Sequence, residues 1–323
     1  MEFNAVNSRF LSKMGHRGAF AMALGELADT MPDLAVVTAD LGLLTGLDRF
    51  IKQHPEKFHN VGIAEQNMIG IAAGLAREGF VVFTTTYATF ITMRSYEQIR
   101  LDVSYMGFNV KVVGTGSGLA MGMLGTSNYG IEDLALMRAL PGMMVVQPCD
   151  GMEIIKTIHA AARHVGPMYI RLTGVLNSPI VYEKDYEFEL GKAVRLREGK
   201  DITIFAAGTM VHEALGAATA LEAQGIGAAV VNMHTAKPID TAAIDRACAE
   251  SALIVTVEEH GVIGGIGSAV AEYKATLKKT PPQLFLGLPD KFGKVAEYRY
   301  LLERYGLTAP QIARSIEGRY REL

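Results

Sequence analysis

The sequence has 323 residues, 49% of them hydrophobic, and its 31 basic and 34 acidic residues leave a formal net charge of -3. This composition excludes a disordered chain, because there is enough apolar surface for two domains that each bury a core. No lysine- and arginine-rich run of the kind that binds a nucleic-acid backbone is present, so nucleic acid is not an expected partner.

The two cysteines and the apolar segments indicate where the chain works. Cys149 and Cys248 are too few for a disulfide framework, and no CxxC or Cys/His cluster predicts a metal site. We therefore predict no metal ligands in this chain and a reducing, cytoplasmic location. No run of about 18 uncharged apolar residues predicts a membrane span, and MEFNAVNSRFLSKMGHRGAF at the start lacks the apolar core of a signal peptide.

In chain order, the first half alternates amphipathic helical segments with short apolar runs rich in β-branched residues. The expected helices cover about residues 16–29, 66–78, 131–140 and 151–164. The apolar runs are LAVVTAD from Leu34, FVVFTTT from Phe80, VKVVGTG from Val110, MMVVQP from Met143 and MYIRL from Met168. Such continuous runs are typical of parallel strands that are buried on both faces. The pattern predicts an α/β domain with a doubly wound parallel sheet over residues 1–180.

The regular pattern lapses between Asn177 and Lys200, in the polar segment NSPIVYEKDYEFELGKAVRLREGK, which we interpret as a domain boundary. A second alternation of strands and helices follows it. The strands are DITIFAAG from Asp201, GAAVVNM from Gly227, ALIVTVEE from Ala252 and QLFLGLP from Gln283, with helices near 211, 240 and 267. The sequence therefore predicts a second, smaller α/β domain over residues 190–323.

Glycine-rich and histidine-containing segments have ordinary interpretations. GTGSG from Gly114 and GVIGGIG from Gly261 lack the GxGxxG spacing of a dinucleotide site, so we predict that both are tight turns between a strand and a helix. His234 and His260 both follow strands, where loop residues often act in binding or catalysis. We expect both histidines to be structural, hydrogen-bonded at an interface between domains.

Glu65 is the most informative acid in the chain. It stands in NVGIAEQN, before a segment whose apolar residues recur at helical spacing, namely Met68, Ile71, Ala72 and Leu75. An acid at the start of a helix can simply complement the helix dipole and the free backbone N–H groups. A catalytic or cofactor-binding role is the alternative, and the rest of the chain must decide between the two.

Three strings occur in order: VGIAEQNMIGIAAGLAREGF from Val61, YATF from Tyr87 and GIEDLALMRALPGMMVVQP from Gly130. Together they resemble the pyrimidine-binding domain of transketolases and of the related deoxyxylulose-phosphate synthases. VVNMHTAKPID and VEEHGVIGGIGSAVAE in the second half resemble the C-terminal domain of the same family. The resemblance covers nearly the whole chain and is nearest to the C-terminal subunit of split, two-gene transketolases.

The resemblance implies that thiamine diphosphate is the cofactor. In this family a glutamate hydrogen-bonds N1′ of the aminopyrimidine and favours the imino tautomer whose nitrogen removes the C2 proton, and Glu65 matches that position. Its neighbours Ile63 and Ala64 would help to exclude water. Phe90 matches the aromatic residue that stacks on the pyrimidine, and Tyr87 matches a second wall of that pocket.

The resemblance also implies a partner chain. Asp40, which ends the VVTAD strand, falls where the family has an acid near the active site, although it could equally cap the next turn. The family holds the diphosphate and its Mg²⁺ with a GDG motif and a downstream asparagine, and no GDG occurs here. We therefore expect an N-terminal transketolase subunit to supply this half of the site, in an α2β2 heterotetramer in which the chain also self-associates.

Two departures from the family pattern concern the substrate. Where the family usually reads GxDGPTHQ this chain has GMLGTSNYG, so an acid becomes Leu124 and a histidine becomes Asn128. Asparagine can hydrogen-bond a sugar hydroxyl but cannot transfer a proton as imidazole does, unless Asn128 merely caps the following helix. Many transketolases carry an arginine for the substrate phosphate. Here Arg171 lies a few positions early, and Gly174 or Val175 stands at the expected place. We therefore expect Leu124, Asn128 and Arg171 to lie at the substrate. We also expect that substrate to differ from the ordinary pentose phosphates.

The implied activity is the transfer of a two-carbon ketol unit from a ketose, or its phosphate, to an aldose or its phosphate. Two alternatives stay open. The β subunit of a 2-oxo acid dehydrogenase E1 component shares both domains and the glutamate, although HTAKPID and EEHGVIGG favour transketolase. A non-catalytic scaffold or nucleotide-binding subunit could keep the fold, although Glu65 together with Phe90 argues against it.

Overall fold

The apolar runs of the first half form a seven-stranded sheet with the order β10-β5-β6-β4-β3-β1-β2. The computed structural model describes residues 2–173 and 176–323, so Gly174 and Val175 lie outside the described residues. The strands of this sheet are β1 Leu34–Thr38, β2 Phe58–Asn60, β3 Val81–Tyr87, β4 Val110–Ser117, β5 Met144–Val146, β6 Met168–Thr173 and β10 Thr235–Lys237. Neighbouring strands pair in parallel except for β10, which pairs antiparallel with β5. The predicted parallel α/β sheet is confirmed.

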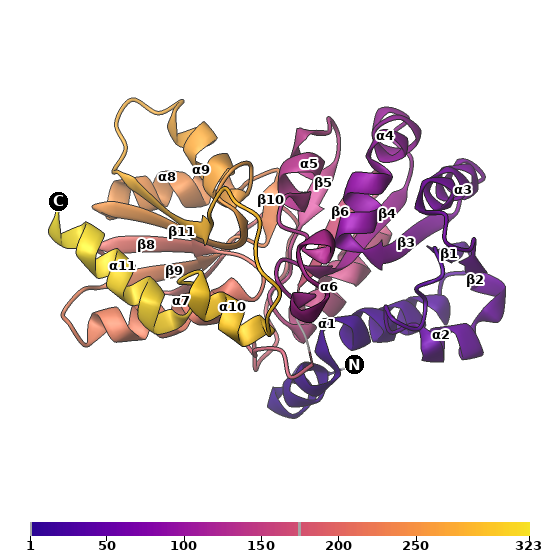
Figure 1. Ribbon diagram of the computed structural model, residues 1–323, viewed down its shortest axis with the longest axis horizontal. Helices are drawn as coiled ribbons and strands as arrows, with labels where there is room; N and C mark the ends of the chain where they lie inside the picture. The colour runs from indigo at the N-terminus through magenta and orange to yellow at the C-terminus, as the bar shows by residue number, and fades with distance from the viewer. Residues whose placement is uncertain (1, 174–175) are drawn as a thin grey trace.

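The strands of this sheet are apolar on both faces because helices cover both faces (Figure 1). Successive residues of a strand point to opposite sides. Leu34 and Val36 therefore join one core with α1 Ala5–Ala28 and α6 Gly151–Arg163, and Ala35 and Val37 join another with α3 and α5. The remaining helices of this half are α2 Asp48–Gln53, η1 Pro55–Lys57, α3 Glu65–Arg77, η2 Phe90–Arg94, α4 Tyr96–Gln98, η3 Ile99–Tyr105, η4 Gly122–Leu124, η5 Thr126–Asn128 and α5 Asp133–Ala139.

Helix α1 begins earlier than the sequence pattern predicted. The side chain of Asn4 accepts hydrogen bonds from the backbone N–H groups of Val6 and Asn7 and so caps a first segment. At Gly15 the backbone turns to a φ of 71° and a ψ of 179°, a conformation open mainly to glycine, and the helix is kinked there. The predicted helix at 16–29 is thus the part that follows the kink.

The second half builds a five-stranded sheet with the order β12-β11-β8-β9-β7. Its strands are β7 Val194–Arg197, β8 Ile202–Ala206, β9 Ala228–Asn232, β11 Leu253–Gly261 and β12 Gln283–Leu288. Its helices are α7 Met210–Glu222, α8 Thr241–Glu250, α9 Ile266–Lys274, α10 Tyr298–Arg304 and α11 Ala309–Arg321. Helices α7 and α11 pack into the core on one face, and α8 and α9 into the core on the other. None of the helices in the described part of the chain is long and apolar enough to cross a membrane.

Two strands complicate the boundary that the sequence suggested. β7 lies inside the polar segment 177–200, as an antiparallel edge strand beside β9. β10 belongs to the second half of the chain but completes the edge of the first sheet, where the backbone N–H of Gln147 also donates to the carbonyl of His234 at 2.6 Å. The two halves are therefore joined through shared backbone pairing as well as through side chains.

Candidate active site

Glu65 is the first residue of α3, and its carboxylate is buried. No side chain caps this helix start, and only 4% of Glu65 is exposed. Its Oε1 atom accepts a hydrogen bond from Nη1 of Arg94 at 2.5 Å. Ile63, which was expected to exclude water, is 81% exposed, so this chain alone leaves that side of the site open.

Tyr87 and Phe90 form an aromatic wall beside this carboxylate. Tyr87 ends β3 and is buried, and Phe90 opens the π-helical turn η2 three residues later. Their ring centroids lie 5.6 Å apart at an interplanar angle of 47°. The guanidinium of Arg94 lies 4.4 Å above the Phe90 ring, and it therefore links Phe90 to Glu65. The structure thus brings together the three residues that the sequence assigned to the pyrimidine.

Asp40 lies at the same edge of the sheet, where β1 and β2 end. Its backbone has a φ of 59°, and its N–H donates to Oδ1 of Asn60 at 3.0 Å. Nδ2 of Asn60 donates to the Asp40 carboxylate at 3.2 Å, and Oδ1 of Asn60 also accepts from the N–H of Gly62. Asp40 therefore fixes the segment that leads into Glu65, while the residue itself remains exposed.

Arg94 shows that this arrangement can hold a flat, nitrogen-rich group. A guanidinium is planar, stacks on aromatic faces and bonds carboxylates. The Arg94 side chain makes both contacts, one with Phe90 and one with Glu65. An aminopyrimidine ring makes the same two kinds of contact, so the residues present fit that end of thiamine diphosphate. The sequence analysis did not identify Arg94, although its i, i+4 spacing from Phe90 was a usable signal.

The loop with Leu124 and Asn128 lies directly beside the aromatic wall. Thr89, the residue before Phe90, donates its hydroxyl to the backbone carbonyl of Asn128 at 3.1 Å. Nδ2 of Asn128 donates to the carbonyl of Leu124 at 3.2 Å, and the Leu124 side chain is 55% exposed. The N-cap of α5 is Glu132, and no side chain caps that helix. The interpretation of Asn128 as a helix cap is therefore wrong.

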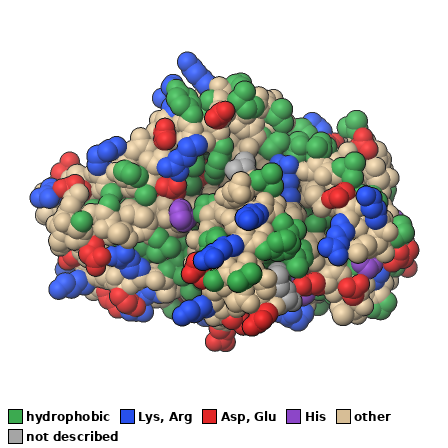
Figure 2. All heavy atoms as spheres, turned by 90° about the horizontal axis from the view of Figure 1, so that it is seen from below, with side chains coloured by type: hydrophobic (Ala, Val, Ile, Leu, Met, Phe, Trp, Pro, Cys, Tyr) green, Lys and Arg blue, Asp and Glu red, His purple; other side chains and the backbone are tan. Residues whose placement is uncertain are grey.

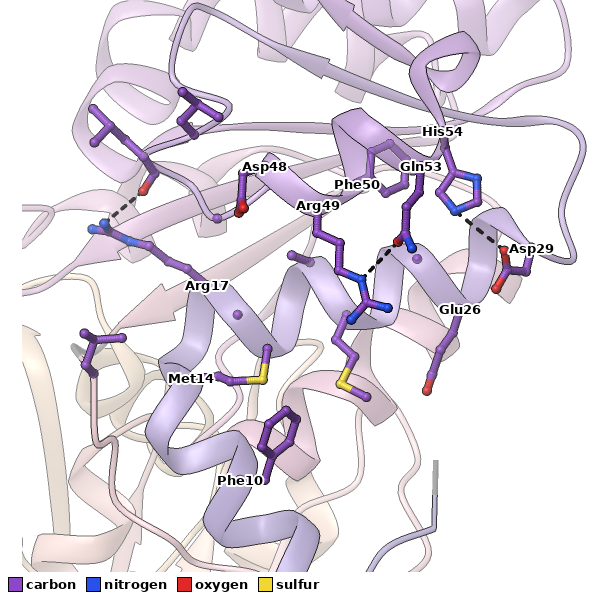
Figure 3. Close-up of a pocket in the computed structure, with 18 residues that line it drawn as sticks. Phe10, Met14, Arg17, Glu26, Asp29, Asp48, Arg49, Phe50, Gln53 and His54 are labelled. Atoms are coloured by element: carbon purple, nitrogen blue, oxygen red, sulfur yellow. Dashed lines mark hydrogen bonds and ion pairs between the residues drawn. The ribbon is translucent and has the colours of Figure 1, made fainter.

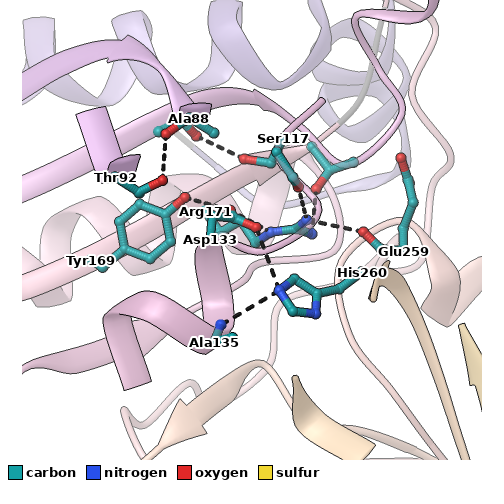
Figure 4. Close-up of polar contacts among 12 residues, drawn as sticks. Ala88, Thr92, Ser117, Asp133, Ala135, Tyr169, Arg171, Glu259 and His260 are labelled. Carbon is teal, nitrogen blue, oxygen red and sulfur yellow. Dashed lines mark hydrogen bonds and ion pairs between the residues drawn. The ribbon is translucent and has the colours of Figure 1, made fainter. Parts of the chain in front are cut away.

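Arg171 is the one expected substrate residue whose side chain does not open to the site, since it lies in a buried network that Figure 4 draws together with Ala88 and Thr92. Its side chain is completely buried, and it donates to Oδ2 of Asp133 at 2.8 Å. It also donates to the carbonyls of Gly130 at 2.7 Å and Glu259 at 3.0 Å. We correct the assignment accordingly, because every guanidinium nitrogen already has a protein acceptor, the last being the hydroxyl of Thr173.

His234, between β9 and β10, and His260, which lies inside β11 instead of after it, are both buried, in agreement with the structural roles expected for them. His234 approaches the Thr235 hydroxyl at 2.9 Å, and burial lowers its pKa. His260 lies at the interface shown in Figure 4, with Nδ1 at 2.7 Å from the carbonyl of Gly261. Burial lowers the pKa of His260 to about 4, so the ring is neutral at physiological pH.

One of the two glycine-rich turns was predicted correctly. GVIGGIG connects β11 to α9, whose first N–H groups, from Ile266 and Gly267, donate to the buried carboxylate of Glu258 at 2.8 and 2.9 Å. Burial raises the pKa of Glu258 to about 7. The prediction for GTGSG was wrong, because Gly114 to Ser117 continue strand β4 and a long loop follows instead of a helix.

Arg17 is a second arginine that the sequence analysis missed. It follows the kink in α1, and its guanidinium lies 5.6 Å from the Tyr87 ring centroid. Nη1 donates to the carbonyl of Leu44 at 2.9 Å, Nη2 meets the sulfur of Met121 at 3.3 Å, and buried Nε has no partner. No motif marks this residue, because its neighbours are 27 and 104 positions away in the chain.

Two hollows flank Arg17. The larger, of about 830 Å³, runs between α1, the loop through Leu44 and α2 (Figure 3). The smaller, of about 460 Å³, is bordered by Met121 and Leu124. Glu65 lines neither hollow, so we define the candidate site by the contacts of its side chains instead of by the size of the cavity. The Arg17 side chain lies beside the Tyr87 ring of the aromatic wall and also lines both hollows.

Exposed apolar side chains border the site. Single exposed apolar residues are ordinary, whereas contiguous exposed apolar patches are uncommon on monomeric proteins and mark interaction sites. Figure 2 shows such side chains between charged ones on the face that includes α1 and α2. Those next to the residues described above are Leu43, Leu44, Ile63, Met93, Met123 and Leu124, each at least 36% exposed.

The two sheets and this carboxylate–aromatic site agree with the matches to known families. Residues 12–176 match the family model of the transketolase pyrimidine-binding domain. Residues 191–312 match that of the transketolase C-terminal domain. The chain therefore belongs to the transketolase family.

Individual relatives place the chain among separate transketolase subunits. It is 42% identical to the 6-deoxy-6-sulfo-D-fructose transketolase subunit SqwH of a Clostridium strain, over 93% of this chain and 92% of the relative. It is 39% identical to one of the apulose-4-phosphate transketolase subunits of Phocaeicola vulgatus, over 93% and 95%. A solved structure described as a split gene transketolase, inactive beta4 tetramer, matches with a TM-score of 0.84 and 43% identity, over 94% and 97%. These matches do not favour the 2-oxo acid dehydrogenase alternative.

Proposed function

We propose that the chain is the C-terminal subunit of a thiamine-diphosphate-dependent transketolase that moves a two-carbon ketol unit from a ketose to an aldose. The observation that carries this proposal is the buried carboxylate of Glu65 at the start of α3, with the aromatic wall beside it. A helix-start acid without further function would gain nothing from a neighbouring aromatic pair. The names of the relatives, which are subunits of sugar transketolases, support the same reaction.

The chain's own residues would divide the work as follows. When bound, thiamine diphosphate supplies the carbon nucleophile that carries the two-carbon unit. Glu65 would hold and exchange a proton with N1′ of the aminopyrimidine, Phe90 would stack on the ring, and Tyr87 would close its side. Asp40 would keep the Glu65 segment in place. Arg17, which lines both hollows, would meet an anionic group of the substrate with its guanidinium.

A partner chain would complete the site. The sequence has no GDG motif for the diphosphate and Mg²⁺, and the exposed apolar side chains that border the site offer a surface for a second protein. We propose an N-terminal transketolase subunit as this partner and an α2β2 heterotetramer as the assembly. The described split-gene relative forms a tetramer of one subunit type, which supports self-association of this chain.

The isolated chain is expected to bind thiamine diphosphate poorly, because the groups that bind the charged diphosphate through Mg²⁺ lie on the partner. Calorimetric titration with thiamine diphosphate and Mg²⁺, with and without the purified partner, measures this directly. Micromolar binding by the chain alone would contradict the proposed division of the site between two subunits.

The loop beside the aromatic wall is expected to set sugar preference. Changing Leu124→Asp together with Asn128→His should shift the ratio of kcat/KM values toward xylulose 5-phosphate, by roughly 1–3 kcal/mol if one or two hydrogen bonds are regained. The measurement is a panel of ketose donors that includes xylulose 5-phosphate and 6-deoxy-6-sulfo-D-fructose.

Exposed residues just beyond the end of α9 provide the matched control for this loop. Ala275→Asp with Lys279→His adds the same groups four positions apart, as in the test variant, on a surface away from the candidate site. Because Asn128 caps no helix, both double variants should keep the thermal midpoint of the wild type. An unchanged donor preference in the Leu124 and Asn128 variant would rule out a role of this loop in specificity.

A further inference from the structure

Arg94 contacts the two side chains that the proposed function assigns to the aminopyrimidine ring. Its Nη1 lies 2.5 Å from Oε1 of Glu65, and its Cζ lies 4.4 Å from the centroid of the Phe90 ring. The two contacts fix a geometric relation, because Oε1 of Glu65 must lie on the same side of the Phe90 ring as the guanidinium. A flat group that bonds this oxygen and stacks on this face must therefore take the place of the guanidinium.

The chemistry of the guanidinium suits a temporary occupant. It is planar and delocalised, it carries N–H donors at its edge, and it stacks on aromatic faces. An aminopyrimidine shares these properties, being a flat ring with nitrogen atoms at its edge. Burying the Glu65 carboxylate without any partner would be costly, so the Arg94 guanidinium stabilises the chain before the aminopyrimidine ring binds.

Arg94 is also free to leave. Its side chain is 49% exposed, so water can solvate the guanidinium when it leaves the Glu65 carboxylate, which is itself only 4% exposed. Arg171 is the opposite case in the same chain, since it is completely buried and donates to four acceptors. Arg94 also sits at the end of the short π-helical turn Phe90–Arg94, so a rotation of its side chain disturbs no long helix.

We propose that Arg94 is a placeholder for the aminopyrimidine ring: in the cofactor-free chain it occupies the Glu65 carboxylate and one face of Phe90, and it leaves both when the ring binds. This inference rests on the proposed function, because it assumes that Glu65 and Phe90 receive that ring. Arg94 would then compete with the cofactor for the same place. The apparent affinity for thiamine diphosphate would therefore depend on the fraction of molecules in which Arg94 lies outside the site.

The test measures affinity of thiamine diphosphate, with Mg²⁺, for the chain assembled with its partner. Arg94→Gln removes the charge that competes for the Glu65 carboxylate and should lower the Kd by about two- to five-fold. The gain should appear in the association rate, because no guanidinium has to move first. Arg94→Lys keeps the charge without the planar fork and should give an intermediate Kd.

Arg100→Gln is the matched control. Arg100 pairs with Glu97 at 2.8 Å on the next helical segment, and both side chains are about half exposed. Its substitution should leave the Kd unchanged, and the thermal midpoints of the cofactor-free variants show whether each one is folded. An equal or weaker affinity of Arg94→Gln would overturn the placeholder role and make Arg94 a positioning residue for Glu65. If the assembled wild-type protein bound no thiamine diphosphate, the proposed function itself would fail.

Discussion

Glu65→Gln is expected to leave the fold intact and to slow proton exchange at C2 of bound thiamine diphosphate by roughly 100- to 10,000-fold, the range for loss of a general acid–base group. The amide keeps the size and a hydrogen bond but cannot exchange a proton with N1′ as a carboxyl can. Proton–deuterium exchange at C2, followed by NMR in the assembled enzyme, reports this step without depending on the identity of the sugar.

The control for this experiment lies at the other end of the same helix. Glu78, the C-cap residue of α3, is exposed and has no proposed role in binding the cofactor. In the Glu78→Gln enzyme the C2 proton should therefore exchange at the wild-type rate. Wild-type exchange in the Glu65→Gln enzyme would leave only the other interpretation, in which Glu65 is an acid that complements the start of the helix.

The central strands of both sheets and the edge strand β12 could be predicted from the sequence, whereas the edge strands β2, β7 and β10 could not. β1, β3, β4 and β8 are buried along their whole length, so they appear as continuous apolar runs. β2, β7 and β10 have only three or four residues and are partly exposed, so they leave no such run. The pairing of β10 with the first sheet also depends on a contact between distant parts of the chain, which no local pattern records.

The candidate site was predictable where its residues follow one another closely. Glu65, Tyr87 and Phe90 lie in one helix–strand–turn unit whose order is visible in the sequence. Arg17 reaches the same place from the first helix, through contacts with a carbonyl and a sulfur that carry no sequence signal. The resemblance placed Arg171 near a substrate-binding arginine of the family, but whether its side chain faces solvent or a buried carboxylate depends on tertiary packing that no local pattern records.

The ion pair of Arg171 and Asp133 lies within the first domain, where that domain contacts the second. Asp133 is the first residue of α5 and is completely buried, and its Oδ2 atom also accepts the Tyr169 hydroxyl at 2.6 Å. From β6, Arg171 reaches across to the backbone carbonyl of Glu259 on β11. The Glu259 carboxylate in turn accepts from the N–H of Leu119 at 2.6 Å, so the network also anchors the start of the loop that contains Leu124 and Asn128.

Arg171→Met is expected to lower the free energy of unfolding by about 3–5 kcal/mol, because removing one member of a buried ion pair leaves the other charge without compensation. The carbonyls of Gly130 and Glu259 would lose their donor as well. Urea denaturation followed by circular dichroism measures the change. Arg246→Met is the matched control, because Arg246 is 50% exposed in its pair with Glu250, and its loss should cost less than about 1 kcal/mol.

A double variant separates the burial of charge from the loss of packing. Replacing both partners, with Asp133→Leu and Arg171→Met, removes the unpaired carboxylate and should recover part of the stability lost in the single variant. If the double variant were no more stable than Arg171→Met, the loss of stability would come instead from the lost hydrogen bonds to the backbone carbonyls. An Arg171→Met protein that kept wild-type stability, but lost kcat/KM only for phosphorylated sugars, would contradict the structural role and return Arg171 to the substrate.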